Sequence, residues 1–124
     1  MQDLKIRTKQ FAIDCWRLCA LLPKSREYNN LVFQLLKSSS SVGANWRASQ
    51  RPKSDADFIN KLKIVEEEVD ESCFWLEILI DIWNEDTSEA ERLWKESDEI
   101  LRITVASINT AKAKLKKKGN QKIK

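Results

Sequence analysis

Residues 38–79 read SSSSVGANWRASQRPKSDADFINKLKIVEEEVDESCFWLEIL, and this stretch holds the strongest fold signal of the chain. From Phe58 onward, apolar or small residues recur at alternating intervals of four and three as far as Trp83. Such spacing keeps one stripe of a helix facing its neighbours, as the a and d positions do in a coiled coil. The stripe consists of Phe58, Leu62, Val65, Val69, Ser72, Leu76, Leu79 and Trp83. We therefore expect one long helix that packs lengthwise against other helices.

Serine and acidic residues mark where two helices begin. Ser54 and Asp57 form a capping box, in which each side chain can accept a hydrogen bond from a free backbone amide of the other's turn. We expect this helix to run from the box to about Asn84. A second box, from Ser88 to Glu91, predicts the start of another helix. The expected buried stripe of that helix is Ala90, Leu93, Trp94, Ser97, Leu101, Thr104, Ile108, Ala111 and Leu115.

Two further helices precede the long one. Pro23 cannot continue a helix, so the first is expected from about Thr8 to Leu22. The second is expected to begin between residues 25 and 28. The connections lie at residues 23–26, 50–53 and 84–87. Because such short connections force consecutive helices to be antiparallel, the predicted fold is all-α, an antiparallel up-down four-helix bundle.

Small residues gather in the second helix, where Ser41, Gly43 and Ala44 follow one another closely. Small side chains let two helix backbones approach, so we expect this segment to be a helix-packing surface. On that interpretation, replacing Ala44 with Leu would overpack the contact and cost about 1 to 3 kcal/mol. Asn45 is expected to make a buried hydrogen bond between helices that fixes their register.

The composition predicts one helical domain. The chain has 124 residues, of which 42% are hydrophobic and 33% charged, with only two Gly and two Pro. We assign residues 1–118 to the bundle and 119–124 to a short basic tail. No apolar run approaches the roughly 20 residues that cross a bilayer, and the N-terminal residues lack the apolar segment of a signal peptide. We therefore expect a cytoplasmic protein, without a membrane partner, whose three cysteines are reduced.

Most catalytic sites need residue types that are scarce here. The chain has no histidine, the commonest general base and metal ligand. Its two glycines, Gly43 and Gly119, cannot form a phosphate-binding loop. The acidic run from Glu66 to Glu71 is typical of a solvated helix face, because carboxylate metal sites in four-helix bundles use Glu-x-x-His pairs. We predict a protein that is not an enzyme and needs no cofactor or metal.

Positive charge is concentrated in particular segments. Residues 112–124 carry seven lysines and no acidic residue, so the rest of the chain has a net charge of −4, the overall +3 less +7. The candidate nucleic-acid-binding residues are Arg47, Arg51, Lys53, Lys61, Lys63, Lys112, Lys114, Lys116, Lys117 and Lys118. Such residues contact phosphates with little dependence on base sequence, so RNA or DNA is an expected partner. The alternative is that lysines near a helix C-terminus favour the helix dipole and keep a frayed end soluble.

The C-terminal part of the long helix is apolar around more of its circumference than one seam can bury. An isolated chain would expose the excess, and exposed patches of this kind usually mark a protein partner. The simplest partner is another copy of the same chain. We therefore take Trp75, Ile78 and Ile82 as candidate residues of an oligomer interface.

Two segments resemble a known family. Ser41 to Arg47, SVGANWR, is similar to the SVGANYR-type signature of the 23S rRNA-intervening-sequence proteins, with Trp46 where Tyr is usual. Ser54 to Leu62 resembles that family's SKADFI-type helix start. The resemblance implies a small bacterial four-helix bundle that forms a homopentamer. A related branch serves diversity-generating retroelements as an accessory protein that binds reverse transcriptase and nucleic acid. The alternative function is therefore an accessory subunit, for example of a reverse transcriptase, with no direct nucleic-acid contact.

Overall fold

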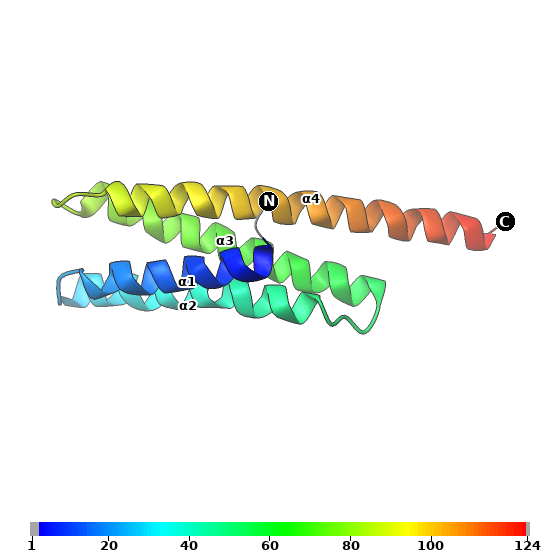
Figure 1. The fold of residues 1–124 in the computed structure, drawn as a ribbon, viewed down its shortest axis with the longest axis horizontal. Helices are drawn as coiled ribbons and strands as arrows, with labels where there is room; N and C mark the ends of the chain where they lie inside the picture. The colour runs from blue at the N-terminus through cyan, green and yellow to red at the C-terminus, as the bar shows by residue number, and fades with distance from the viewer. Residues whose placement is uncertain (1–2, 124) are drawn as a thin grey trace.

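The computed structural model describes residues 3–123 and shows four α-helices and no strand in that range. The helices are α1 (Leu4–Ala20), α2 (Arg26–Ser49), α3 (Asp55–Ile82) and α4 (Ser88–Ile123). Each helix lies antiparallel beside the next, and α1 closes the bundle by packing against α4 (Figure 1). The predicted all-α, up-down four-helix bundle is confirmed.

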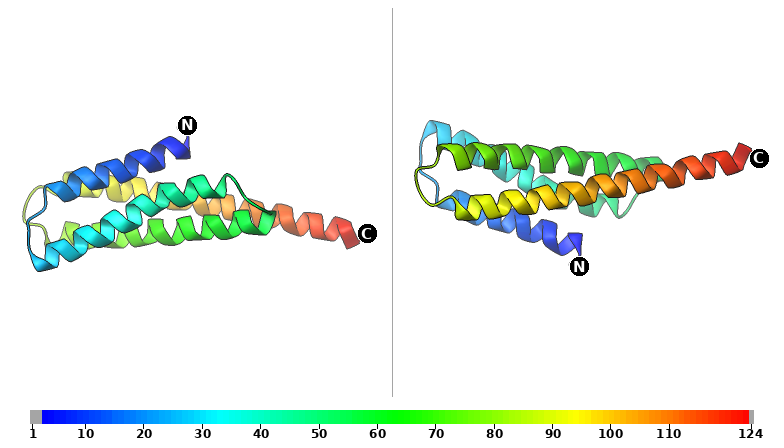
Figure 2. Two further views of the ribbon diagram at one scale, coloured as in Figure 1. Left: turned by 90° about the horizontal axis from the view of Figure 1, so that it is seen from below. Right: turned by 90° about the horizontal axis from the view of Figure 1, so that it is seen from above.

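The four helices differ in length, and this shapes one end of the bundle. α1 has 17 residues, α2 24, α3 28 and α4 36. α1 starts partway along the bundle, whereas α4 runs past the turn between α2 and α3 (Figures 1 and 2). Residues 119–123, which the sequence assigned to a tail, continue α4 as helix. None of these four helices is long and apolar enough to cross a membrane.

The predicted stripe of α3 forms the centre of the core. Its six central members, Leu62, Val65, Val69, Ser72, Leu76 and Leu79, are fully buried. Small polar side chains let the neighbouring helices approach α3 closely. Ser72 Oγ donates to Ser38 Oγ of α2 at 3.0 Å, and Cys73 Sγ lies 2.9 Å from Ser97 Oγ of α4. These buried hydroxyls therefore keep hydrogen-bond partners.

The predicted cap at Ser54 is confirmed, although its Asp57 partner bonds the preceding amide, and the second predicted box is wrong. Ser54 Oγ accepts a hydrogen bond from Asp57 N at 3.0 Å, and Asp57 Oδ2 accepts one from Lys53 N at 2.9 Å. At the start of α4 the capping side chain is Asp86, whose Oδ1 accepts a hydrogen bond from Ser88 N at 2.9 Å. Ser88 is thus the first residue of the helix and not its cap, because the carboxylate that accepts from its free amide belongs to Asp86.

α1 begins at Leu4, earlier than the predicted start near Thr8. Asp3 precedes it as the N-cap, and its side chain accepts a hydrogen bond from Lys5 N at 3.1 Å. The extra turn buries Leu4 and Arg7. The sequence pattern missed it because Arg7 is a charged residue on a buried face.

The buried stripe of α4 is wider at one point and shorter at its end than predicted. Ile100, which the predicted stripe omits, is fully buried. α4 packs against both α1 and α3, so it buries more than one row of residues. Leu115, by contrast, is 38% exposed, and it lines an open groove beside the start of α3.

The small residues of α2 have different surroundings. A Cβ on Gly43 would lie 3.2 Å from Thr8 Oγ1, so Gly43 permits the close approach of α1. Ala44 is exposed, and its predicted packing role is wrong because the next residue of a helix points about 100° away. The predicted interhelical hydrogen bond of Asn45 is also wrong. Its Nδ2 donates to Ser41 O within α2, at 2.8 Å.

Candidate nucleic-acid interface

The turn between α2 and α3 and the C-terminal part of α4 lie at the same end of the molecule (Figure 2), and both carry basic residues. Lys118 Nζ of α4 lies 2.9 Å from Asp55 Oδ2 at the start of α3, although 63 positions separate them in sequence. Arg51 and Lys53 belong to the turn that immediately precedes Asp55. We call Arg51, Lys53, Lys112, Lys114, Lys116, Lys117 and Lys118 the basic end.

Most of the basic end faces solvent without neutralisation. Its exposed cations that form no ion pair within the described residues are Arg51, Lys53, Lys112, Lys114, Lys116 and Lys117. Only Lys118 has an acidic partner there. Lys124 and the side chain of Lys122 lie outside the described residues. The protruding helix therefore presents a group of unneutralised charges.

Three other predicted cations have different surroundings. Lys61 Nζ pairs with Asp57 Oδ2 at 2.6 Å, and this hydrogen bond lowers the pKa of Asp57. Lys63 borders a hollow whose other charged residues are acidic, among them Glu67. Arg47 borders α1, in a hollow that it shares with two lysines of that helix. Because Asp57 Oδ2 also accepts a hydrogen bond from Lys53 N, Lys61 lies next to the basic end, but it is ion-paired. Arg47 and Lys63 instead border other hollows.

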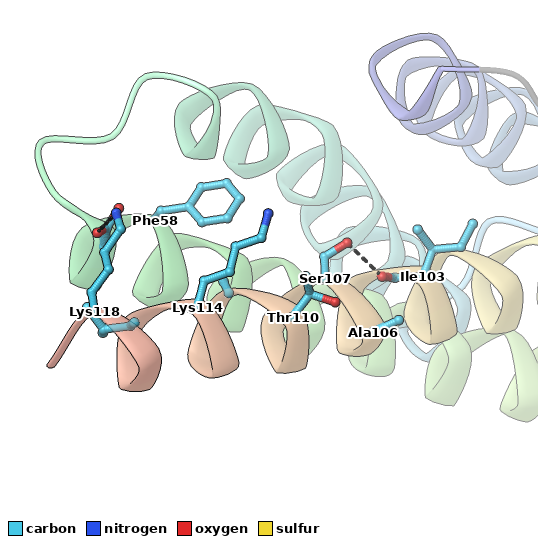
Figure 3. Close-up of a pocket in the computed structure, with 10 residues that line it drawn as sticks. Phe58, Ile103, Ala106, Ser107, Thr110, Lys114 and Lys118 are labelled. Atoms are coloured by element: carbon cyan, nitrogen blue, oxygen red, sulfur yellow. Dashed lines mark hydrogen bonds and ion pairs between the residues drawn. The ribbon is translucent and has the colours of Figure 1, made fainter. Parts of the chain in front are cut away.

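A groove of about 570 Å³ lies beside the basic end, between the start of α3 and the face of α4 (Figure 3). Its lining residues are Asp55, Phe58, Ile103, Ala106, Ser107, Thr110, Ala111, Lys114, Leu115 and Lys118. Phe58 comes from α3, and the ring lies on the same side of α4 as the Lys114 side chain. The groove therefore combines an apolar surface with two cations. The sequence pattern assigned Phe58 only to the core.

The groove exists because α1 is short. Arg7 holds α1 on α4, with Nη2 2.6 Å from Glu96 Oε1 and Nη1 3.1 Å from Glu99 Oε1. The hydrogen bond with Glu96 raises the pKa of Arg7, although burial opposes this. Ile103 and Ser107 follow Glu99 at intervals of four residues on the same face of α4. Because α1 does not extend that far, this part of the face stays open.

The acidic and sulfur-containing side chains do not gather into a metal site. Within residues 3–121, no three His, Cys, Asp or Glu side chains are placed to hold a metal ion. Cys15, Cys19 and Cys73 are free and buried. Burial raises the pKa of all three thiols, that of Cys19 to about 11. They are therefore protonated at neutral pH and poor nucleophiles.

The candidate oligomer residues of α3 are only partly exposed. Trp75 and Ile78 pack against the core, while Ile82 is 47% exposed. The sequence pattern missed Phe74, which is 54% exposed and whose ring meets that of Trp75 edge-on, with centroids 5.2 Å apart. It also did not single out Trp16 of α1 or Phe33 of α2, which are 64% and 62% exposed. In the sequence, these residues could have been recognised as aromatic side chains that lie outside the predicted buried stripe.

The fold and sequence both agree with known proteins. The profile of the 23S rRNA-intervening sequence proteins matches residues 2–106, so the match ends before the α4 lysines of the basic end. A crystal structure from Bacteroides thetaiotaomicron, described as a protein with unknown function from the S23 ribosomal protein family, is 32% identical. The similarity covers 86% of this chain and 98% of that one, with a TM-score of 0.78. No functionally curated protein matches the chain. The chain therefore belongs to the 23S rRNA-intervening sequence protein family.

Proposed function

We propose that the protein is a non-enzymatic helical scaffold that binds the phosphates of RNA or DNA through its basic end. The observation that carries this proposal is the tertiary convergence of α4 lysines with Arg51 and Lys53, with only Lys118 neutralised among them. Phosphate binding needs several cations within reach of one strand and gains affinity from the release of counterions. The lysines of the protruding part of α4 meet that need.

The alternative, that the lysines only stabilise and solubilise the end of α4, explains less. It accounts for cations near a helix C-terminus, which interact favourably with the helix dipole within the last turn. It does not account for the position of Arg51 and Lys53, which belong to another turn of the fold. It also does not account for the α4 lysines from Lys112 to Lys118, which precede the last turn of the helix.

The experiment compares two variants that each lose four positive charges. The test variant replaces Lys112, Lys114, Lys116 and Lys117 with Gln. The control variant replaces Arg17, Lys24, Lys37 and Lys95, four exposed cations without an ion pair in the described residues, with Gln. Binding of labelled RNA and DNA is measured by fluorescence anisotropy over a range of salt concentrations.

We expect the test variant to bind more weakly and the control variant to bind like the wild type. The slope of log affinity against log salt should become shallower by about 0.7 to 0.9 for each phosphate that the variant no longer neutralises. The weakening should be similar for unrelated base sequences. Equal weakening in both variants would show that net charge alone matters. No wild-type binding at about 50 mM salt would rule the proposal out.

A second candidate function, a scaffold for other proteins, is favoured by apolar residues on two oppositely charged faces. The first is the basic face, a groove of about 340 Å³ between α1 and α2 that includes Ile13, Trp16 and Leu36. The cations Lys9 and Arg47 border the neighbouring hollow, which shares Ile13. Apolar patches of this kind usually mark a protein partner.

The second face is the acidic ridge of α3. Residues 64–82 contain seven Asp or Glu and no Lys or Arg. Ile64, Phe74 and Ile82 are exposed along this stretch. A basic apolar face and an acidic apolar face on one molecule can pair between two copies of it. We propose self-association through these faces into the homopentamer that the family resemblance implies. An accessory role beside another enzyme, such as a reverse transcriptase, would use the same surfaces.

A further inference from the structure

We infer that the nucleic acid bound at the basic end is single-stranded and that one of its bases enters the groove against Phe58. This inference rests on the proposed function and adds the class of ligand. It starts from the fact that an apolar groove lies directly beside cations. Lys114 and Lys118 line the same groove as Phe58, Ile103 and Leu115.

Phosphate contacts alone leave the groove without a role. A duplex presents its backbone to a protein surface and keeps the faces of its bases stacked inside. A single strand can turn a base outward and stack it on an aromatic side chain, while its phosphates follow a line of cations. The juxtaposition of an aromatic ring with lysines spaced along α4 fits the single strand.

The geometry of the groove fits a base with little sequence preference. Its volume of about 570 Å³ lies in the range of small-ligand sites. Phe58 and Lys114 lie on the same side of α4, and the ion pair between Lys118 and Asp55 lies at one end of the groove (Figure 3). Besides the two lysines, the polar groups on the α4 side are the hydroxyls of Ser107 and Thr110. Ser107 Oγ already donates to Ile103 O at 2.9 Å and can accept, whereas Thr110 can donate or accept. Such groups can bond any of the bases.

A helix from another protein is the competing occupant, because the groove continues the surface on which α1 packs. The charges favour the strand. Alongside the groove, α4 carries exposed lysines from Lys112 to Lys118 on several sides of the helix. A helix seated in the groove would contact only those on one side, whereas a flexible strand can follow them.

The test measures binding of an oligothymidine of about 12 nucleotides and of a duplex of the same length, at matched salt. Phe58→Leu keeps an apolar side chain but removes the stacking ring, and Phe58→Tyr keeps the ring. Phe33→Leu makes the same change at an exposed phenylalanine outside the groove. Thermal unfolding of each variant checks that the bundle is intact.

We expect Phe58→Leu to weaken binding of the single strand by about 5-fold to 100-fold and binding of the duplex hardly at all. Phe58→Tyr should retain most of the affinity, and Phe33→Leu should bind like the wild type. Equal binding of strand and duplex, unaffected by Phe58→Leu, would overturn the inference and leave phosphate binding standing. Failure of both probes to bind would instead remove the proposed function. If Phe58→Leu changes only the mass of the protein in light scattering, the groove is a protein interface and the inference is wrong.

Discussion

Gly43 and Ala44 are neighbours in the sequence, yet one touches another helix and the other faces outward. We predict that Gly43→Leu lowers the free energy of unfolding by about 1 to 3 kcal/mol, because the added side chain would meet Thr8. Ala44→Leu is the matched control, and its effect should stay within about 0.5 kcal/mol, as for other exposed sites. Urea denaturation monitored by circular dichroism measures both.

A large loss of stability in Ala44→Leu, with little loss in Gly43→Leu, would contradict this assignment. It would indicate that the small residues of α2 pack through Ala44 in solution, as the sequence pattern alone had predicted. In a self-associated protein, Ala44→Leu could still alter assembly. Light scattering on the same samples separates that effect from a change in the stability of the bundle.

At the scale of one element, α4 divides into a packed part and a protruding part. Ile108 is buried with Ile59 and Leu62 of α3, whereas residues 112–121 are exposed. We predict that Ile108→Ala lowers the free energy of unfolding by about 2 to 5 kcal/mol, because it leaves a cavity between α3 and α4.

Deleting residues 119–124 should leave the unfolding midpoint nearly unchanged, since Gly119 has no neighbour within 4 Å of its Cβ position. A clear drop in that midpoint would mean that the end of α4 packs against something, such as another copy.

At the scale of the whole molecule, the two apolar faces predict head-to-tail assembly. Trp16→Glu should prevent the basic face from binding a second copy, and Phe74→Lys should prevent the acidic ridge from doing so. Each variant alone should be monomeric, because each keeps only one working face. Mixed together, they should form a dimer of about twice 14.5 kDa, since the intact face of one pairs with the intact face of the other. Light scattering at micromolar concentration measures all three samples.

Other outcomes are equally informative. A wild-type protein with the mass of one chain would show that it does not self-associate under these conditions. Variants that assemble like the wild type would show that the contact uses other surfaces. If each variant is monomeric and the mixture is too, head-to-tail pairing of these two faces is wrong, because the mixture still contains one intact face of each kind. A face that pairs with itself would instead leave one of the two variants assembled.

The strongest patterns of the chain predicted the fold well. The spacing from Phe58 to Trp83 is periodic over eight positions, and no polar residue larger than Ser72 interrupts it. The Ser54 box marked the start of α3 because its bonds are local. The start of α1 was predicted less well, because Arg7 is buried by an ion pair with residues 89 and 92 positions away.

The sequence by itself determined the helices, their antiparallel order and the positions of the cations, since hydrophobic period, caps and composition are properties of neighbouring residues. Only the tertiary structure decided which of these residues meet. It placed Lys118 beside Asp55, left the groove next to Phe58 open because α1 does not cover it, and paired Lys61 with Asp57. The physical reason is that such contacts depend on the relative lengths and rotations of packed helices. Those follow from how all four helices fill the core together, and no single segment encodes them.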